Sequence, residues 1–386
     1  MKFFKNVFYV LLIFPIVFSV NAFASKTDLT VGLQLEPPHL DPTGAAAGAI
    51  DQVLYSNVFE GLTRFAWDGS IVPGLAKSWD VSSDGMTYTF HLQKDVKFHD
   101  GTDMNAMDVK FSLDRARAED TTNAQKALFA GITNVEVVDN LKVKITLDKP
   151  NGNFLFNLAW GDAVVVAVDS IENIKQNPIG TGAFVFDKWV QGDRIELKKN
   201  SSYWGTPAKL EKATFKFISD PSAAFAAMMA EDVDVFKSFP APENLVQFEA
   251  DSRFKVLIGS NEGETILSTN NKMEPFNNLK VRKALAHAID RKAIIDGAMF
   301  GYGTPIGTHF APHHPAYVDL TAETNEDQRT SLMQKAQKII ADDYVNGYLF
   351  QRAQLSVINS KVNGMWKNSP TQATDLTAVY WENQII

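Results

Sequence analysis

A strand–helix–strand pattern over residues 210–236 constrains the fold of this chain more than any other feature. Residues 210–218 alternate apolar and polar side chains as a strand does, and residues 222–229 form an alanine-rich stretch typical of a helix. Residues 233–236 read as a second strand. A helix between two strands predicts a parallel pair joined by a crossover, because antiparallel strands need only a short turn.

Strand and helix patterns mix along the rest of the chain as well. Residues 29–35 read as a buried strand, and Asp84-Gly85 is a hairpin turn before an alternating strand at residues 87–92. Hairpins are also expected over residues 135–147 and 183–197. With no internal repeat visible, the fold class is α/β. Apolar residues at helical spacing predict helices at residues 50–62, 108–117, 281–300 and 332–340.

The first 24 residues have the pattern of a secretory signal. Lys2 and Lys5 precede an apolar stretch over residues 7–20, and small residues follow at the positions that a signal peptidase reads. The alternative is a membrane anchor, but the apolar stretch is short for a span of about 20 residues. We therefore expect residues 1–24 to be a signal peptide that directs export of the remaining chain.

Composition and motifs narrow the possible functions. The chain has no cysteine, so disulfides, thiolate metal sites and cysteine nucleophiles are excluded. The formal net charge is -8 and no block of basic residues occurs, so nucleic acid is not an expected partner. The serine-hydrolase and zinc-protease motifs Gly-x-Ser-x-Gly and His-Glu-x-x-His are both absent. These features favour a binding protein without a cofactor over an enzyme, and a secreted hydrolase stays open as an alternative.

Three histidines, His309, His313 and His314, cluster beside Pro312 and Pro315. Their spacing could supply metal ligands, as imidazole often does. However, the two prolines break any helix there, and no carboxylate stands at an interval that would orient the rings. We interpret the cluster as hydrogen-bonding loop histidines, with no metal site, and keep a metal or metal-chelate binder as the alternative.

Several short blocks, in this order, resemble one family. They include Leu40-Asp41-Pro42, Asn57-Val58-Phe59-Glu60-Gly61-Leu62, the stretch from Val72 to Trp79, and the stretch from Val96 to Gly101, followed by Pro178 to Phe184 and Val281 to Leu285. Over nearly its whole length after the signal, the chain is similar to the bacterial extracellular solute-binding proteins of family 5. This family includes the dipeptide-, oligopeptide-, glutathione- and nickel-binding components of ABC importers.

The resemblance implies a two-lobed periplasmic-binding-protein fold of type II, in its peptide-binding cluster. It implies a large lobe from residues 25–262 and 345–386, a second lobe from residues 263–344, and a hinge that the chain crosses twice. A peptide or similar small solute would be held between the lobes in the periplasm. An ABC permease in the inner membrane would be the second partner, and the protein itself would be a monomer with no catalytic activity.

Candidate ligand-binding residues also follow from the resemblance. The loop after Leu40-Asp41-Pro42 and the turn after the strand ending at Phe236 face the ligand in relatives. Trp160 sits in a segment that often lines the cleft, and Asn270 and Asn271 lie near an expected hinge crossing. For the aromatic residues the alternative is core packing, and for the alanines it is a plain loop. The candidates are Thr43, Gly44, Ala45, Ala46, Ala47, Trp160, Lys237, Ser238, Phe239, Asn270 and Asn271.

One departure from the family pattern concerns the second lobe. Relatives continue after a turn like that of residues 314–317 with a long α/β stretch, whereas here Thr321 leads almost directly into what resembles the family's final helix. The resemblance thus implies an internal deletion that truncates the second lobe. The apolar faces of residues 281–300 and 332–340 would then be exposed and would favour association. We expect weak or absent peptide binding, and a vestigial protein with little binding is a further alternative.

Overall fold

The structure is a computed structural model and describes most of the chain after the predicted signal. The predicted signal peptide, the histidine cluster, and Ala45 and Ala46 lie outside the described residues. Among the described residues, no helix has both the length and the apolar character that a membrane crossing requires. The described residues are 26–44, 47–306 and 345–382, with Ser331, Lys335, Lys338, Ile339 and Asp342.

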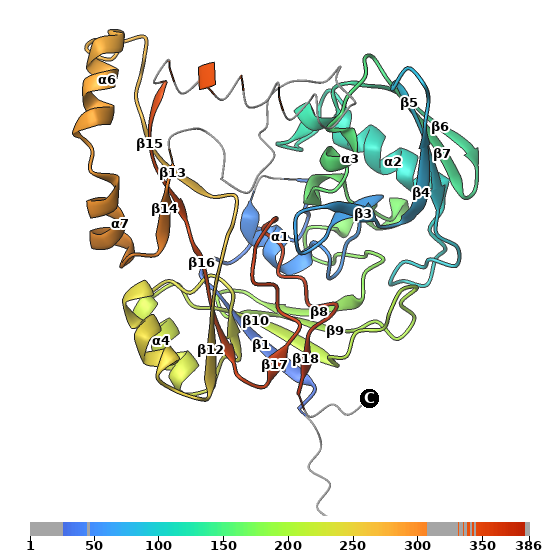
Figure 1. Ribbon diagram of the computed structural model, residues 1–386. Coiled ribbons are helices and arrows are strands. Elements are labelled where there is room, and N and C mark those ends of the chain that lie inside the picture. Colours follow the sequence, from blue (N-terminus) through green and yellow to red (C-terminus); the bar gives the residue numbers. More distant parts are fainter. Residues whose placement is uncertain are drawn as a thin grey trace, which may run out of the picture.

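A seven-stranded mixed sheet organises the larger part of the molecule (Figure 1). Its strand order is β12-β16-β11-β1-β10-β9-β8. The strands are β1 (Asp28–Leu33), β8 (Phe184–Val190), β9 (Arg194–Lys199), β10 (Lys212–Phe217), β11 (Val235–Phe236), β12 (Phe254–Gly259) and β16 (Gln354–Asn359).

The predicted strand–helix–strand unit is formed by β10, α4 (Pro221–Met229) and β11. The strands are parallel as expected, but they are not neighbours. β1 lies between them and pairs in parallel with both. Leu29, Val31 and Leu33 of β1 are almost completely buried, which suits a central strand. A local pattern cannot show which strand, distant in sequence, enters between two predicted neighbours.

A second, antiparallel sheet has the order β4-β5-β7-β6 and packs on helix α2. Both predicted hairpins are present in it, with Gly85 in the left-handed conformation at the first turn. The third predicted hairpin is β8–β9. Helix α2 begins two residues before the predicted start at residue 108. The side chain of Asn105 accepts the backbone N–H of Met107 and so caps the helix at this earlier point. These elements are β4 (Ala76–Val81), β5 (Thr87–Leu92), α2 (Ala106–Arg117), β6 (Ile132–Asp139) and β7 (Lys142–Leu147).

Short elements complete the larger part. Helix α1 ends at Leu54, well before the predicted end at residue 62. The remaining helices and strands are α1 (Gly48–Leu54), β2 (Thr63–Phe65), β3 (Ile71–Pro73), α3 (Phe154–Asn157), α5 (Leu245–Glu249), β17 (Val362–Asn363) and β18 (Tyr380–Trp381), with the 3-10 helices η1 (Lys126–Phe129), η2 (Gly161–Ala163), η3 (Val168–Asn173) and η4 (Pro242–Asn244).

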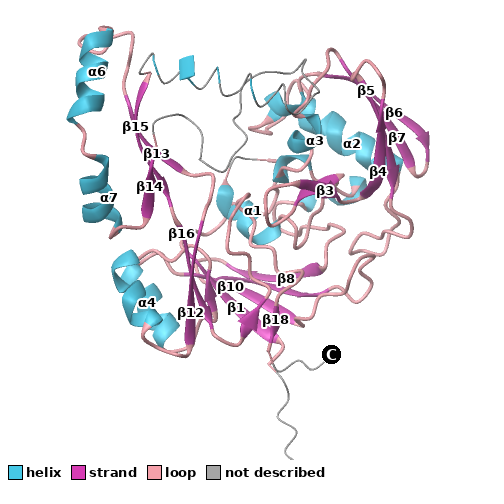
Figure 2. Ribbon diagram, in the orientation of Figure 1, coloured by secondary structure: helices cyan, strands magenta, loops and turns pink. Residues whose placement is uncertain are grey.

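The smaller part is a three-stranded sheet, β13-β15-β14, flanked by two helices (Figure 2). The single helix predicted over residues 281–300 is divided in two, because the Asp290 side chain accepts the N–H of Ala293 and caps a new helix. No residue of α6 is buried, and Ile295 is the one buried residue of α7. The elements are β13 (Glu264–Ser268), α6 (Leu279–Ala288), α7 (Arg291–Met299), β14 (Gly303–Pro305) and β15 (Asn346–Arg352).

The chain crosses between the two parts at two adjacent points. The outward crossing, residues 260–263, lies between β12 and β13, and the return crossing at Ala353 lies between β15 and β16. Gln351 Nε2 donates to the carbonyl of Asn261 over 2.5 Å, which joins the crossings. A lobe boundary at residue 345 would assign β15 to the large lobe, whereas β15 pairs with β13 and β14. We therefore propose Ala353 as the return point.

Asn57 connects the end of α1 to the segment near the C-terminus. Its buried side-chain amide donates to the carbonyl of Thr374 over 2.8 Å, and its carbonyl oxygen accepts the N–H of Leu376 over 3.0 Å. We expect Asn57→Ala to lower the free energy of unfolding by roughly 2–4 kcal/mol, because buried backbone groups lose their partners. Urea denaturation measures this loss. Exposed Asn134→Ala is the matched control, and equal stability of the two variants would contradict the prediction.

Candidate functional site

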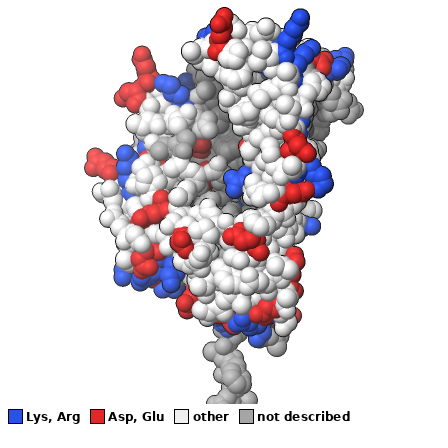
Figure 3. Space-filling model, turned by 90° about the vertical axis from the view of Figure 1, so that its left-hand side faces the viewer, with Lys and Arg blue, Asp and Glu red and all other residues white. Residues whose placement is uncertain are grey.

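A cavity of about 580 Å³ opens beside the two crossings. Gln34 follows β1 and Lys237 follows β11, and both line it. The carboxyl ends of neighbouring parallel strands lie at the same sheet edge, which is where ligands bind in open α/β sheets. Helix α1, the outward crossing and residues 369–374 supply the remaining walls. On the side of the molecule that carries α6 and α7, the surface is hollowed, and acidic and basic side chains are scattered around the hollow (Figure 3).

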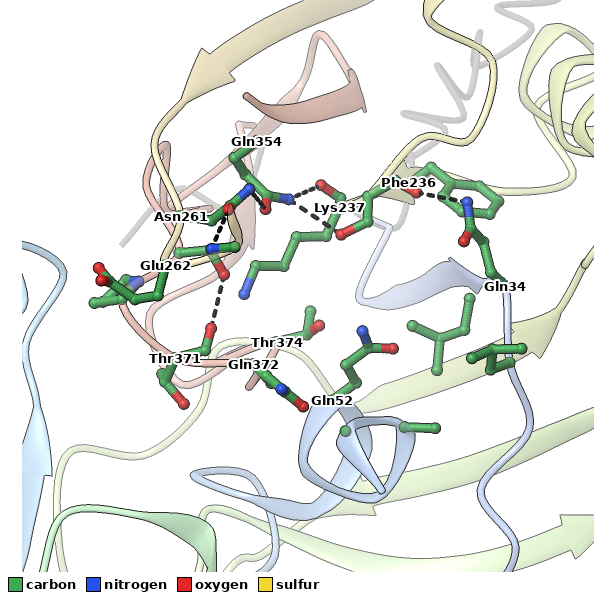
Figure 4. Close-up of a pocket in the computed structure, with 18 of the residues that line it drawn as sticks. Gln34, Gln52, Phe236, Lys237, Asn261, Glu262, Gln354, Thr371, Gln372 and Thr374 are labelled. Carbon is green, nitrogen blue, oxygen red and sulfur yellow. Dashed lines mark hydrogen bonds between the residues drawn. The ribbon is translucent and has the colours of Figure 1, made fainter. Parts of the chain in front are cut away.

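Hydrogen bonds fix the turn after β11 at the wall of this cavity (Figure 4). The side-chain amide of Gln354 donates to the carbonyl of Lys237 and, over 3.2 Å, to Ser238 Oγ. Ser356 Oγ donates to the same carbonyl over 2.7 Å. Asn261 on the outward crossing donates to Gln354 Oε1 over 3.5 Å. Residues from both crossings thus hold the backbone that presents Lys237.

Lys237 is a buried cation, with a side chain that extends into the space enclosed by the labelled residues in Figure 4. Its Nζ donates to the carbonyl of Ala373. Burial lowers the pKa of Lys237 to about 8, and the negative charge of Asp375 opposes this shift. At neutral pH the ammonium therefore remains mostly protonated.

The other polar groups of the cavity are mainly neutral. Of the lining residues that the structure describes, Lys237 and Glu262 carry a charge. Neutral donors and acceptors of this kind suit the polar parts of a small solute. The described residues contain no group of three or more histidine or acidic side chains placed to hold a metal ion. The amides and hydroxyls belong to Gln34, Gln52, Ser238, Asn261, Gln354, Ser369, Thr371, Gln372 and Thr374.

Two carboxyl groups lie near Trp160, which also lines the cavity. Burial raises the pKa of Asp51 to about 7, with a further contribution from Asp162, and burial raises the pKa of Asp162 to about 6. A raised carboxyl pKa means that the folded state binds more protons than the unfolded state. These two groups therefore make stability fall as the pH rises from the ordinary carboxyl pKa of 3.8 to about 6 for Asp162 and about 7 for Asp51.

Three of the predicted ligand-binding residues, Trp160, Lys237 and Ser238, line the cavity together. Phe239 lies beyond it, at an adjacent hollow of about 390 Å³, and packs its ring against Phe236 and Phe248. For Phe239, the surroundings are those of the alternative to ligand contact, which was packing in the core. Contact between any of these residues and a ligand stays a prediction.

Thr43, Gly44 and Ala47, the described candidates in the loop before α1, are not among the residues that line the cavity. Both the N–H and the hydroxyl of Thr43 donate to Asp41 Oδ1, and Arg115 donates to both of these side chains. Gly44 follows in the same tight loop, where its N–H donates to the carbonyl of Asp41. Ala47 is the residue before α1, adjacent to two lining residues, Gly48 and Ala49.

Asn270 and Asn271 lie after β13, within the smaller part and away from the lining residues of the cavity. Asn271 Nδ2 donates to the carbonyl of Val345 over 2.8 Å, and Asn270 Oδ1 accepts the N–H of Lys272. Their contacts are therefore those of residues that shape a loop and attach it to the start of β15.

Sequence reasoning missed every amide side chain that lines the cavity within the described part of the chain. Gln34 could have been found, because it directly follows β1, and β1 is parallel to β11, the strand that Lys237 follows. Asn261 and Gln354 flank the crossings, so an accurate hinge position would have indicated them. Gln52 and Gln372 belong to no motif, and nothing in the sequence pattern marks them.

Comparison with known proteins adds a family match and curated relatives. The profile of the bacterial extracellular solute-binding proteins, family 5 Middle, matches residues 70–374. The glutathione-binding protein GsiB of Pectobacterium atrosepticum is 36% identical over 273 residues, which cover 69% of this chain and 52% of that protein. GsiB of Shigella flexneri is 34% identical over 305 residues, covering 77% of this chain and 58% of that protein. The match thus spans little more than half the length of these relatives.

Solved structures share the fold. The periplasmic binding protein DppA of Helicobacter pylori, in complex with the peptide STSA, superposes with a TM-score of 0.84 at 21% identity, over 93% of this chain and 99% of that chain. The dipeptide-binding protein of a Pseudoalteromonas strain, in complex with Met-Leu, gives 0.81 at 18% identity, over 92% and 100%. The larger and smaller parts of the present molecule are therefore the two lobes of a periplasmic-binding-protein fold.

The buried charge of Lys237 predicts a pH dependence of stability. Between pH 8 and 10.5 the unfolded state holds a proton that the folded state has lost, so this residue makes stability rise with pH in that window. We expect the free energy of unfolding of the wild type, relative to that of Lys237→Met, to increase by about 3 kcal/mol from pH 7.5 to 10.5. Paired denaturation curves measure it. A difference that stays constant with pH would contradict the lowered pKa.

Proposed function

This chain belongs to the bacterial extracellular solute-binding proteins of family 5, and we propose that it is the periplasmic substrate-binding component of an ABC importer. In this role it captures peptides or similar small solutes and delivers them, chemically unaltered, to a permease in the inner membrane. The observation that carries the proposal is the polar cavity of about 580 Å³ at the two crossings.

The position of the cavity supports capture by lobe closure. Asn261, Glu262 and Gly263 of the outward crossing form part of its wall, so rotation of the smaller lobe about the crossings changes its opening. Its volume lies within the usual range of small-molecule sites, roughly 300–1,000 Å³. Relatives named for glutathione binding and structural neighbours that hold short peptides support peptides as the solute class.

We further propose that the smaller lobe is truncated and encloses the solute only partly. Gly263 is the last residue of the outward crossing to line the cavity, and no described strand or helix of the smaller lobe lines it. Leu267, Leu279 and Phe300 of this lobe expose 41%, 37% and 54% of their surface. The alignments with GsiB cover 52% and 58% of those proteins, whereas the superpositions on DppA and the dipeptide-binding protein cover 99% and 100% of those chains. An incomplete wall leaves the bound solute partly hydrated and its affinity low.

A binding experiment tests both proposals. Calorimetric titration with a library of dipeptides and tripeptides should show binding with dissociation constants in the micromolar range or weaker, roughly -8 kcal/mol or less favourable. Each bound peptide should be recovered intact. Failure to bind any solute, or conversion of one, would contradict the transport role, whereas submicromolar binding would refute the incomplete wall alone.

A variant of α1 tests the location of the site. Gln52 lines the cavity on this helix, so Gln52→Ala should weaken the binding of the best library peptide by about threefold to tenfold, because a neutral hydrogen bond is lost. Gln247→Ala removes an exposed amide of α5 that does not line the cavity and should leave affinity unchanged. Unchanged affinity of Gln52→Ala at equal stability would mean that the solute binds elsewhere.

A further inference from the structure

We propose that Lys237 is the anchor for a carboxylate group of the solute, so that the protein selects small solutes that carry one free carboxylate. This inference rests on the proposed function, because it places the charge of the solute within the same cavity. The geometry that carries it is a buried ammonium at the cavity wall with a single neutral acceptor.

The ammonium of Lys237 is incompletely satisfied within the described part of the chain. An ammonium has three N–H donors, and here the acceptor in hydrogen-bond contact is the carbonyl of Ala373. Asp375 acts on Lys237 through its charge, but its Oδ1 accepts the N–H and hydroxyl of Thr377, and it forms no ion pair with Lys237. Burying an unpaired charge is unfavourable, so an anion that enters the cavity gains a strong interaction.

The backbone around Lys237 is held in place before any solute arrives. Its carbonyl accepts hydrogen bonds from both Gln354 and Ser356, on the strand that leaves the return crossing. Because both donors belong to β16, this strand fixes the backbone from which the lysine side chain extends. Such preorganisation raises affinity, since less order is imposed on binding.

The charges around the cavity limit the solute to one carboxylate at this position. Among the described residues that line the cavity, Lys237 is the one cation and Glu262 the one acid, so at most one anionic group of a solute can find a counter-charge there. A phosphate dianion would need more positive charge, whereas a single carboxylate balances one ammonium. The neutral amides of Gln34, Gln52 and Gln354 suit the uncharged amide groups of a peptide.

Matched acid and amide solutes test this inference on the unaltered protein. Dipeptides and tripeptides are titrated as free acids and as their C-terminal amides by calorimetry. The wild type should bind each free acid at least about tenfold more tightly than its amide, which is the effect of one charge-assisted hydrogen bond. Equal affinities for acids and amides would overturn the anchor while leaving the transport role intact. Binding of neither form would overturn both.

Variants then assign the effect to Lys237. Lys237→Met should lower the affinity for free acids at least about tenfold and leave the affinity for amides within about twofold, so that the preference disappears. Lys255→Met, which removes an exposed lysine on β12, should keep the wild-type preference. A preference for free acids that persists in Lys237→Met would overturn the inference. The comparison of acids with amides uses the wild type alone. The inference therefore stays testable even if Lys237→Met folds poorly.

Discussion

Parallel pairing of β1 with β10 on one side and β11 on the other is the constraint on which the rest of the structure depends. It places the carboxyl ends of β1 and β11 at one sheet edge, so that Gln34 and Lys237 face a common space. β16 pairs antiparallel with β11, which brings Gln354 to the same edge. The cavity is therefore a consequence of strand order, and the loops around it only complete its walls.

The two lobes differ in how firmly their elements are held. In the larger lobe, two sheets are covered by clusters of buried apolar side chains, and Asn57 attaches the segment near the C-terminus to α1. In the smaller lobe, α6 has no buried residue and α7 has only Ile295. Elements with few buried apolar contacts open at low free energy. Local opening is thus expected in the smaller lobe before the larger one.

Local patterns in the sequence predicted the hairpins, α2 and the parallel orientation of β10 and β11, because turns, caps and periodicity act over a few residues. They did not predict that β1 enters between β10 and β11, since no local signal records pairing across such a distance. The break at Asp290 was missed because apolar spacing continues through it, although an aspartate that can cap is visible there. Trp160, Lys237 and Ser238 were found through family resemblance, while Gln52 and Gln372 carry no signal.

The cavity and the stability of the fold make opposite demands on Lys237. A methionine at this position would fill the same space without burying a charge, and the lowered pKa of the lysine shows that the protein environment disfavours that charge. The carbonyl of Ala373 and the distant charge of Asp375 compensate only in part. A buried group that lowers stability in the free protein gains its counter-charge when an anionic solute enters, so the cost of the buried charge is offset in the bound state.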